Sequence, residues 1–215
     1  MSPISIKRRG IMFVLSSPSG AGKTTVAQQV LKQEKNLNIS ISCTTRKARP
    51  SEVDGKDYYF ISENQYKEKV NKEEFLEHAE VFGNYYGTPK FVVEKHLDAG
   101  QDVIFDIDWQ GTQQLAENAR DDLVSIFILP PSIEVLEKRL IGRNQDTEDV
   151  VNRRMSKASD EMSHWPEYDY VIINENLEKT IFDVRSILNS ERLKRLRLKG
   201  LVSFVNKLRS KNGGI

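Results

Sequence analysis

A glycine-rich segment between a buried strand and a helix constrains this chain more than any other feature of its sequence. The apolar run at 11–15 has the length of a strand, and the segment after it reads Ser17-Pro18-Ser19-Gly20-Ala21-Gly22-Lys23-Thr24. Gly20 and Gly22 allow backbone conformations that other residues avoid, so several N–H groups can face one anion. A simple glycine-rich turn is the alternative. The order of strand, loop, Lys-Thr pair and helix instead predicts a phosphate-binding loop.

This loop predicts a place for a metal ion as well as for phosphate. Lys23 would reach the β- and γ-phosphates of a nucleoside triphosphate, and the Thr24 hydroxyl would bind Mg²⁺. Ser17 stands where the usual pattern has its first glycine. An acidic residue is expected at the end of a neighbouring strand, and Asp106 would orient Mg²⁺ there, directly or through water. A carboxylate within an apolar run is costly unless it has a partner, which favours this role over that of a surface carboxylate.

Three further apolar runs, at 103–107, 125–129 and 170–173, indicate the fold class. They do not alternate with polar residues, so we expect strands that are covered on both faces, as in parallel sheets. Helical stripes separate the runs; one consists of Leu177, Ile181, Val184 and Leu188. Alternating strands and helices predict an α/β fold with a doubly wound parallel sheet as its core.

Two segments interrupt this alternation and predict additional lobes. Residues 39–96 are rich in tyrosine, and Ser62 with Gln65 forms a capping box before a short helix. We expect a small mixed α/β lobe there, inserted into a core formed by 10–38, 97–138 and 161–208. Residues 139–160 are rich in Arg, Asp and Glu, which is the composition expected of a helical lid.

The overall composition excludes several classes of protein. The 215 residues contain 32 Lys and Arg against 31 Asp and Glu, a balance that argues against general nucleic-acid binding. Cys43 is the single cysteine, so neither an intrachain disulfide nor a Cys-rich zinc site is expected. No apolar stretch approaches the roughly 18 residues that cross a bilayer, and the run at 11–15 is too short for a secretion signal. We therefore expect a cytoplasmic protein without membrane or nucleic-acid partners.

The inserted segment carries residues that suit a second phosphate and a purine base. The guanidinium groups of Arg46 and Arg49 match a phosphate dianion, although two arginines at this spacing are more often plain surface residues. Tyr58 and Tyr86 add hydroxyl donors. Glu77 accepts hydrogen bonds when ionised, and guanine presents two donors, N1–H and the 2-amino group, on one edge. Hydroxyls of Ser42 and Thr88 would meet its remaining polar atoms; a structural role for Glu77 is the alternative.

The motifs together resemble those of the guanylate kinase family over about residues 10–190. They read SPSGAGKT, SCTTRKARP, EVDGKDYYF, FLEHAEVFGNYYGT, DIDWQG and PPS…RLIGR. The resemblance implies a P-loop core sheet, a GMP-binding lobe and a lid. It also implies Mg²⁺-dependent transfer of the ATP γ-phosphoryl group to GMP, and to dGMP, giving ADP and GDP.

The resemblance assigns roles to individual residues of this chain. It implies ATP binding by 17–24 and guanine contacts from Ser42, Glu77 and Thr88. It implies that Arg46, Arg49, Tyr58 and Tyr86 hold the GMP phosphate, with Asp106 and Asp108 near the acceptor and the metal. The catalytic cations would be Lys23, Arg139, Arg143 and Arg154.

Three other functions stay open at this point. The first is a guanylate-kinase-like module that binds protein and catalyses nothing, although such modules usually lose the intact phosphate loop or the lid arginines. The second is a kinase for another nucleoside monophosphate, such as AMP or dTMP. The third is a P-loop regulator that hydrolyses nucleotide, for which the sequence offers no clear water-positioning residue.

Overall fold

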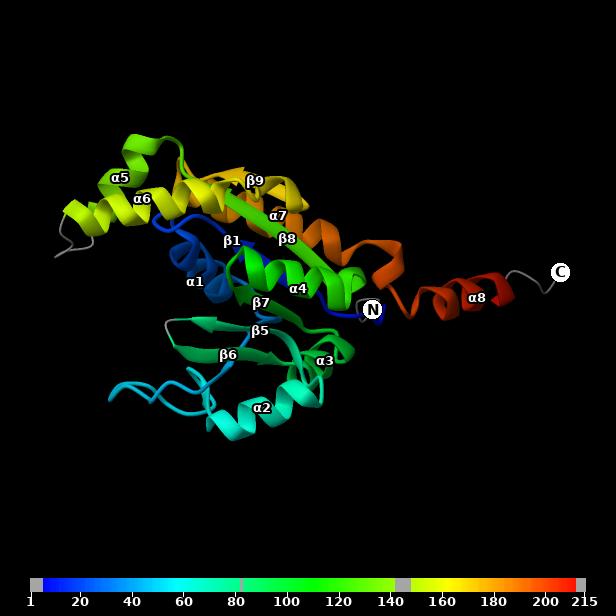
Figure 1. Cartoon of the computed structure of the whole chain (residues 1–215). Coiled ribbons are helices and arrows are strands. Elements are labelled where there is room, and N and C mark those ends of the chain that lie inside the picture. The colour runs from blue at the N-terminus through cyan, green and yellow to red at the C-terminus, as the bar shows by residue number, and fades with distance from the viewer. Residues whose placement is uncertain (1–5, 82, 142–147, 212–215) are drawn as a thin grey trace.

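The computed structural model describes residues 6–81, 83–141 and 148–211, with the backbone alone for 81, 148–154 and 211 (Figure 1). Its strands are β1 (Met12–Ser16), β2 (Leu37–Ile39), β3 (Cys43–Thr44), β4 (Tyr59–Phe60), β5 (Phe75–Val81), β6 (Asn84–Pro89), β7 (Asp102–Asp106), β8 (Leu123–Leu129) and β9 (Tyr170–Ile173). Its α-helices are α1 (Lys23–Gln33), α2 (Glu63–Asn71), α3 (Lys90–Asp98), α4 (Trp109–Ala119), α5 (Ile133–Ile141), α6 (Glu148–Met162), α7 (Leu177–Arg192) and α8 (Leu201–Lys211). Short 3₁₀ turns lie at Arg120–Asp122, Trp165–Glu167 and Arg195–Arg197.

The core is a five-stranded parallel sheet in the order β2-β7-β1-β8-β9. The four apolar runs form β1, β7, β8 and β9, so the predicted α/β class is confirmed. β1 lies at the centre, where Leu15 pairs with Asp106 of β7 and with Ile126 of β8. This position brings the segment after β1 and the acidic end of β7 to the same edge of the sheet.

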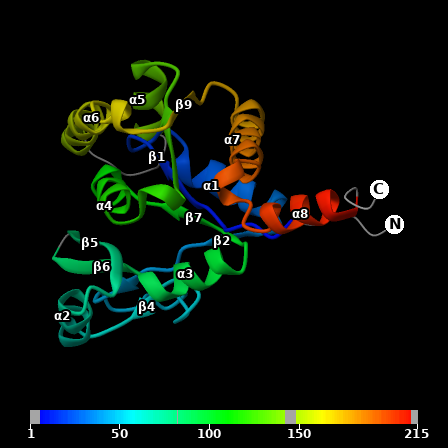
Figure 2. The same cartoon turned by 90° about the vertical axis from the view of Figure 1, so that its right-hand side faces the viewer.

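Successive residues of β1 show why this sheet needs helices on both faces. Phe13 and Leu15 belong to a buried cluster with residues of α1 and α7. Met12 and Val14 point the other way, into a cluster with residues of α3 and α4. Side chains alternate along a strand, so an apolar run without alternation stays out of water only if both faces are covered. Figure 2 shows α1 and α7 on one side of the sheet and α4 on the other.

The small lobe is a second, mixed sheet in the order β4-β3-β6-β5, with α2 packed against it. Tyr66 of α2 stacks on Tyr85 with ring centroids 4.8 Å apart, and Phe75 completes this aromatic cluster. The predicted capping box is confirmed, because the Ser62 hydroxyl accepts from the Gln65 N–H while the Gln65 side chain accepts from the Ser62 N–H.

An irregular register in β5 allows two consecutive side chains, those of Leu76 and Glu77, to be buried on the side of the core. The pairing with β6 shifts between Phe75 and His78. Both of those residues contact Tyr66 of α2, whereas Leu76 joins the core cluster and Glu77 is also buried. A β-bulge re-aims side chains in this way. It places Glu77 on the side of the lobe that meets the core.

Helices α5 and α6 pack against each other through Leu136, Leu140 and Ala158. They lie beside the end of β1 and the start of α1 (Figure 1). The predicted lid start at 139 falls within α5, and α6 continues to Met162, beyond the predicted end. The division of the chain into core, lobe and lid stays a prediction.

Basic residues at both ends of the chain pack at the opposite edge of the sheet. Asp102, at the start of β7, is buried and pairs with Arg8 at 2.6 Å and with Arg192 at 2.7 Å. Arg197 is also buried and pairs with Glu191. Arg8, Arg192 and Arg197 therefore anchor segments near both ends of the chain to the core. Over the described residues, no helix is both long and apolar enough to span a bilayer.

Candidate active site

The glycine-rich segment forms a loop in which both glycines adopt backbone conformations that other residues avoid, as its sequence predicts. Gly20 and Gly22 have φ values of 91° and 102°, which side chains rarely allow. A Cβ atom on Gly22 would lie 2.6 Å from the Asn174 amide nitrogen, and one on Gly20 would lie 3.0 Å from Leu140. The Ala21 N–H donates to the Pro18 carbonyl oxygen at 3.1 Å and closes the turn. Both glycines are therefore required by conformation and by close packing.

The structure brings Lys23, Thr24 and Asp106 together at the carboxyl edge of the sheet. The Lys23 ammonium lies 3.0 Å from Asp106 Oδ1 and donates to the Ile107 carbonyl oxygen at 2.9 Å. The Thr24 hydroxyl donates to Asp106 Oδ2 at 3.2 Å. The hydroxyl and the carboxylate are hard oxygen donors, and Mg²⁺ typically uses one or two such protein ligands while keeping several waters. These residues fit the magnesium site that the sequence predicts.

Arg139 and Asn174 hold the other side of the phosphate loop. Arg139 donates to the carbonyl oxygens of Ala21 and Asn174, at 3.2 and 3.3 Å. The buried Asn174 amide donates to the same Ala21 oxygen at 2.7 Å and accepts from Thr180. Both residues line a cavity of about 530 Å³ beside the loop, together with Gly20, Gly22, Thr25, Glu175 and Leu177. Sequence reasoning missed Asn174, although a polar residue directly after a parallel strand is a signal for this edge of the sheet.

Three of the four predicted phosphate ligands in the small lobe lie together. The Arg46 guanidinium lies 5.4 Å from the centre of the Tyr58 ring, whose edge meets Tyr86. Arg46 pairs with Glu52 at 2.7 Å, and this hydrogen bond is the main reason why the pKa of Glu52 is lowered. Arg49 joins the group through its backbone N–H, which donates to Glu52, and its side chain is exposed. Sequence reasoning also missed Glu52, the acidic residue that orients this segment.

The three predicted base-contacting residues form one chain of hydrogen bonds. The Thr88 hydroxyl donates to Glu77 Oε1 at 2.6 Å. The Ser42 hydroxyl lies 3.3 Å from the Thr88 hydroxyl. Glu77 is only 6% exposed. Burial raises the pKa of its carboxyl group, the Thr88 hydrogen bond opposes this rise, and the charge of Asp108 adds to it. Thr88 bonds this carboxylate through its backbone as well as its hydroxyl. A carboxylate has about four acceptor positions, so Glu77 retains the capacity to accept from a ligand.

Asp108 connects this carboxylate to the core. It is the N-cap of α4, where its Oδ1 accepts from the Gly111 N–H at 3.0 Å. A Cβ on Gly111 would lie 3.3 Å from Glu77 Oε2, so the first turn of α4 approaches the carboxylate closely. The predicted residues of the core edge and those of the small lobe therefore meet around the start of one helix.

Two predicted lid arginines are not placed with this group. Arg143 lies outside the described residues, and Arg154 belongs to the part of α6 that is described by its backbone alone. The described part of α6 makes a different contact with the phosphate loop. The Ser19 N–H donates to Glu161 Oε2 at 2.9 Å. An acidic side chain of α6 thus occupies one of the loop's N–H donors.

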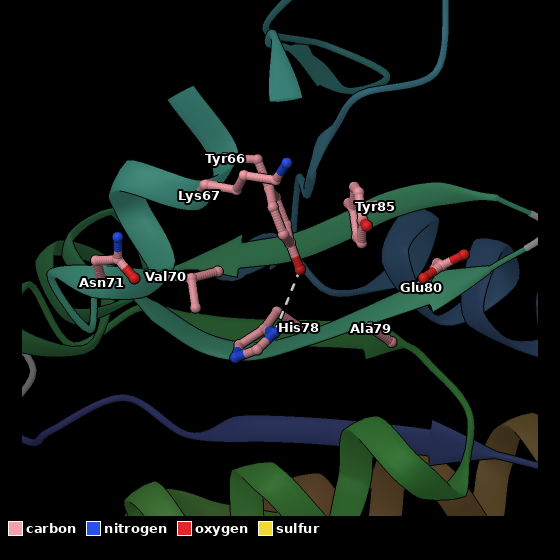
Figure 3. Close-up of a pocket in the computed structure, with 8 residues that line it drawn as sticks. All are labelled: Tyr66, Lys67, Val70, Asn71, His78, Ala79, Glu80 and Tyr85. Carbon is pink, nitrogen blue, oxygen red and sulfur yellow. Dashed lines mark hydrogen bonds between the residues drawn. The ribbon is translucent and has the colours of Figure 1, made fainter. Parts of the chain in front are cut away.

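A separate cavity of about 380 Å³ lies on the small lobe between α2 and strands β5 and β6 (Figure 3). Its lining consists of Tyr66, Lys67, Val70, Asn71, His78, Ala79, Glu80 and Tyr85. The Tyr66 hydroxyl points to His78 Nδ1 at 3.2 Å. These residues include none of the predicted nucleotide contacts, so the cavity belongs to the packing of α2 and not to the site.

Known proteins similar to this chain are guanylate kinases. Residues 9–191 match the family model described as guanylate kinase. A guanylate kinase of Paramagnetospirillum magneticum is 58% identical over 205 residues, covering 95% of this chain and 96% of that protein. One of Rhodospirillum rubrum is 58% identical over 208 residues, covering 97% and 95%. A crystal structure of guanylate kinase from Anaplasma phagocytophilum matches with a TM-score of 0.74 and 40% identity, covering 94% of this chain and 96% of that one.

Proposed function

The chain belongs to the guanylate kinase family and phosphorylates GMP with ATP, and we propose that the residues around the phosphate loop, the start of α4 and the small lobe carry out this reaction. The observation that carries the assignment of the acceptor site is the buried Glu77 carboxylate. It is joined to Thr88 and Ser42 and faces the core helix that follows Asp106 and Asp108.

Glu77 recognises guanine by accepting from two donors. The carboxylate accepts from N1–H and from the 2-amino group, while Ser42 and Thr88 bond the remaining polar atoms. AMP has neither of these donors, so in its complex a buried carboxylate would lose its partners. Sites built to hydrogen-bond a substrate discriminate by about 10⁴–10⁵ against an analogue that lacks the bonding group.

Arg46, Tyr58 and Tyr86 hold the GMP phosphate, and Arg49 turns its exposed side chain to the same group. The guanidinium fork of Arg46 suits two phosphate oxygens at once. Glu52 sets the orientation of Arg46 before the phosphate arrives, because the two side chains are already paired. dGMP is accepted as well, since these contacts involve the base and the phosphate only.

Transfer requires two anions to be held side by side and in line. A GMP phosphate oxygen bonds to the γ-phosphorus, and the bond from that phosphorus to the β–γ bridging oxygen breaks, with its electron pair leaving on ADP. The acceptor is already anionic, so positioning and charge stabilisation account for most of the catalysis. The N–H groups of 17–24 and the Lys23 ammonium stabilise the charge on the transferring group. Arg139, Arg143 and Arg154 provide further cations.

The donor nucleotide is placed by both sides of the phosphate loop. Thr24 and Asp106 would hold Mg²⁺, which would supply positive charge to offset that of the phosphates. The cavity beside Gly22 receives the base of ATP, where the Leu177 side chain is partly exposed and the Arg139 guanidinium is within reach of a ring face. We also propose a cytoplasmic location for the enzyme, as its sequence predicts.

A screen of nucleoside monophosphates tests this function. GMP, dGMP, AMP and dTMP are each offered with ATP and Mg²⁺, and ADP release is measured. We expect fast turnover with GMP and dGMP only, and a Glu77→Ala variant with weaker GMP binding and reduced discrimination. Comparable kcat/KM for AMP and GMP in the wild type would contradict the base assignment. An absence of ADP release with every acceptor would instead favour a protein-binding module.

A further inference from the structure

Helix α4 lies between α6 and the small lobe, and it contacts both the small lobe and the segment that follows α6. In Figures 1 and 2 it lies with α6 on one side and with β5 and β6 on the other. Residues four apart in a helix share a face. Two such pairs, Gln114 with Asn118 and Trp109 with Gln113, contact the two regions separately.

The first pair holds the edge of β5. Gln114 Oε1 accepts from the His78 N–H at 2.9 Å, while Gln114 Nε2 donates to the His78 carbonyl oxygen at 3.0 Å. Asn118 donates to the Leu76 carbonyl oxygen at 2.8 Å. β5 is the edge strand of its sheet, so the side-chain amides stand in for a missing neighbour strand. Both chain neighbours of Glu77 are thereby fixed to the core.

His78 is also held from the opposite side. Its ring meets the Tyr66 hydroxyl of α2, as Figure 3 shows, while its backbone is bonded to α4. A strand clamped on both sides transmits a displacement instead of absorbing it. Any movement of α4 therefore moves Glu77, and a ligand that fixes Glu77 also fixes α4.

The second pair holds the segment that follows α6. The Trp109 indole stacks on the His164 ring, with centroids 3.7 Å apart and planes 10° apart. Gln113 donates to Glu167 Oε2 at 2.8 Å, and the other oxygen of that carboxylate meets His164 Nδ1 at 2.7 Å. These contacts join the segment that follows α6 to the start of the same helix.

We propose that α4 couples the two substrate sites, with Gln114 and Trp109 as its positioning residues. GMP fixes β5 through Glu77, Gln114 passes this constraint to α4, and Trp109 passes it to the segment at His164 that follows α6. This inference rests on the proposed function, because it takes Glu77 as the GMP contact and α6, which contacts the phosphate loop through Glu161, as an ATP-side element. Coupling is reciprocal, so ATP-site occupancy tightens GMP binding by the same factor by which GMP tightens ATP-site binding.

The test measures that factor directly. Calorimetry gives the Kd of GMP alone and with a saturating non-hydrolysable ATP analogue, and also the Kd of the analogue alone. In the wild type we expect GMP to bind more tightly with the analogue, by a factor within the usual range of about 5–150. Gln114→Met keeps the side-chain length but removes both hydrogen bonds of the side-chain amide to His78. We expect the coupling factor of this variant to fall close to 1. His164→Ala removes the ring that stacks on Trp109, at the other contact of α4, and we expect its factor to fall close to 1 as well.

The double variant shows whether the Gln114 and His164 contacts act together through α4 or independently of each other. If both contacts act through α4, Gln114→Met with His164→Ala has no lower factor than either single variant, whereas independent effects add. Glu117→Ala, on the exposed face of the same helix, serves as the control with a wild-type factor. Variants that keep the wild-type factor while remaining folded by thermal unfolding, or a wild type without coupling, would overturn the proposal. Turnover of GMP by the wild type, checked first, separates that result from a failure of the proposed function.

Discussion

The phosphate loop and the arginine segment at 46–52 both offer donors to phosphate, but they are built from different groups. In the loop the donors are backbone N–H groups, and the glycines are fixed by φ values and by neighbours such as Asn174. In the arginine segment the donors are side chains on an irregular stretch, held by Glu52 and by the Tyr58 ring.

This difference separates a rigid site from an adaptable one. Backbone donors locked by packing need no reorganisation when phosphate binds. A guanidinium that is already paired with a carboxylate must share or exchange that partner when the GMP phosphate arrives. On the proposed assignment, we therefore expect the donor phosphates to meet a preformed site and the acceptor phosphate to adjust the arginine segment.

Replacement of Lys23 should give the largest effect and should affect only the rigid site. We expect Lys23→Ala to lower kcat by about 10²–10³, because a cation at the transferring group is lost. The KM for GMP should change little, since the arginine segment is built independently. Steady-state kinetics measure both parameters. Lys32→Ala, exposed on the same helix, is the matched control; a Lys23→Ala variant with near-wild-type kcat would refute the loop assignment.

Changes in the arginine segment should mainly raise the KM for GMP, whereas replacement of Lys23 mainly lowers kcat. We expect Arg46→Ala to raise the KM for GMP roughly 10–100-fold while the KM for ATP is nearly unchanged, because a charge-assisted fork is lost. Arg46→Lys keeps the charge but not the fork, and should recover only part of the affinity. Glu52→Gln should give a smaller rise, since it weakens the orientation of Arg46. A wild-type KM for Arg46→Lys would show that charge alone suffices.

The buried Glu77 carboxylate, which belongs to the acceptor side of the site, can be tested through the pH dependence of stability. Burial raises its pKa in the folded protein, so the wild type loses stability as pH rises from the ordinary value of about 4.5 through the raised value. Glu77→Gln lacks this titration, and we expect it to have a higher Tm than the wild type near pH 7 and no advantage near pH 4. Its KM for GMP should nevertheless be higher. Thermal unfolding across pH measures the first effect; a Glu77→Gln variant that is less stable at pH 7 would contradict it.

The sequence predicted those parts whose signal is local. β1, β7 and β8 are visible as apolar runs because both faces of each strand are buried. β9 is also an apolar run, but it is an edge strand in which Val171 and Ile173 are exposed, so the expectation that it is covered on both faces was wrong. β2 is only three residues long, Leu37–Ile39, and its place in the sheet depends on pairing with β7. The phosphate loop was predictable for the same reason, since its glycines and the Lys-Thr pair act through their own backbone and neighbours.

The parts that the sequence did not predict depend on contacts between distant segments. Gln114 looks like an ordinary polar position of an amphipathic helix, and its partner is the edge of β5, 36 positions earlier in the chain. Glu52 and Asn174 gain their roles only when the arginine segment turns back and when β9 ends beside the loop. The bulge that directs Glu77 toward the core is likewise a property of the pairing with β6.

The smallest expected effect concerns the contact between Glu161 and the Ser19 N–H. In this contact a donor of the phosphate loop is already paired with a carboxylate, as Arg46 is in the arginine segment. Glu161 accepts from the Ser19 N–H, so this donor also has an acidic partner that phosphate must displace. An exposed contact of this kind is worth about 0.2–1 kcal/mol. We therefore expect Glu161→Gln to lower the KM for ATP by about two- to fivefold at most, with the KM for GMP unchanged. Asp160→Asn, exposed and adjacent, is the control. A higher KM for ATP in Glu161→Gln would mean that the carboxylate supports the loop, and the contrast between the two phosphate sites would then be complete.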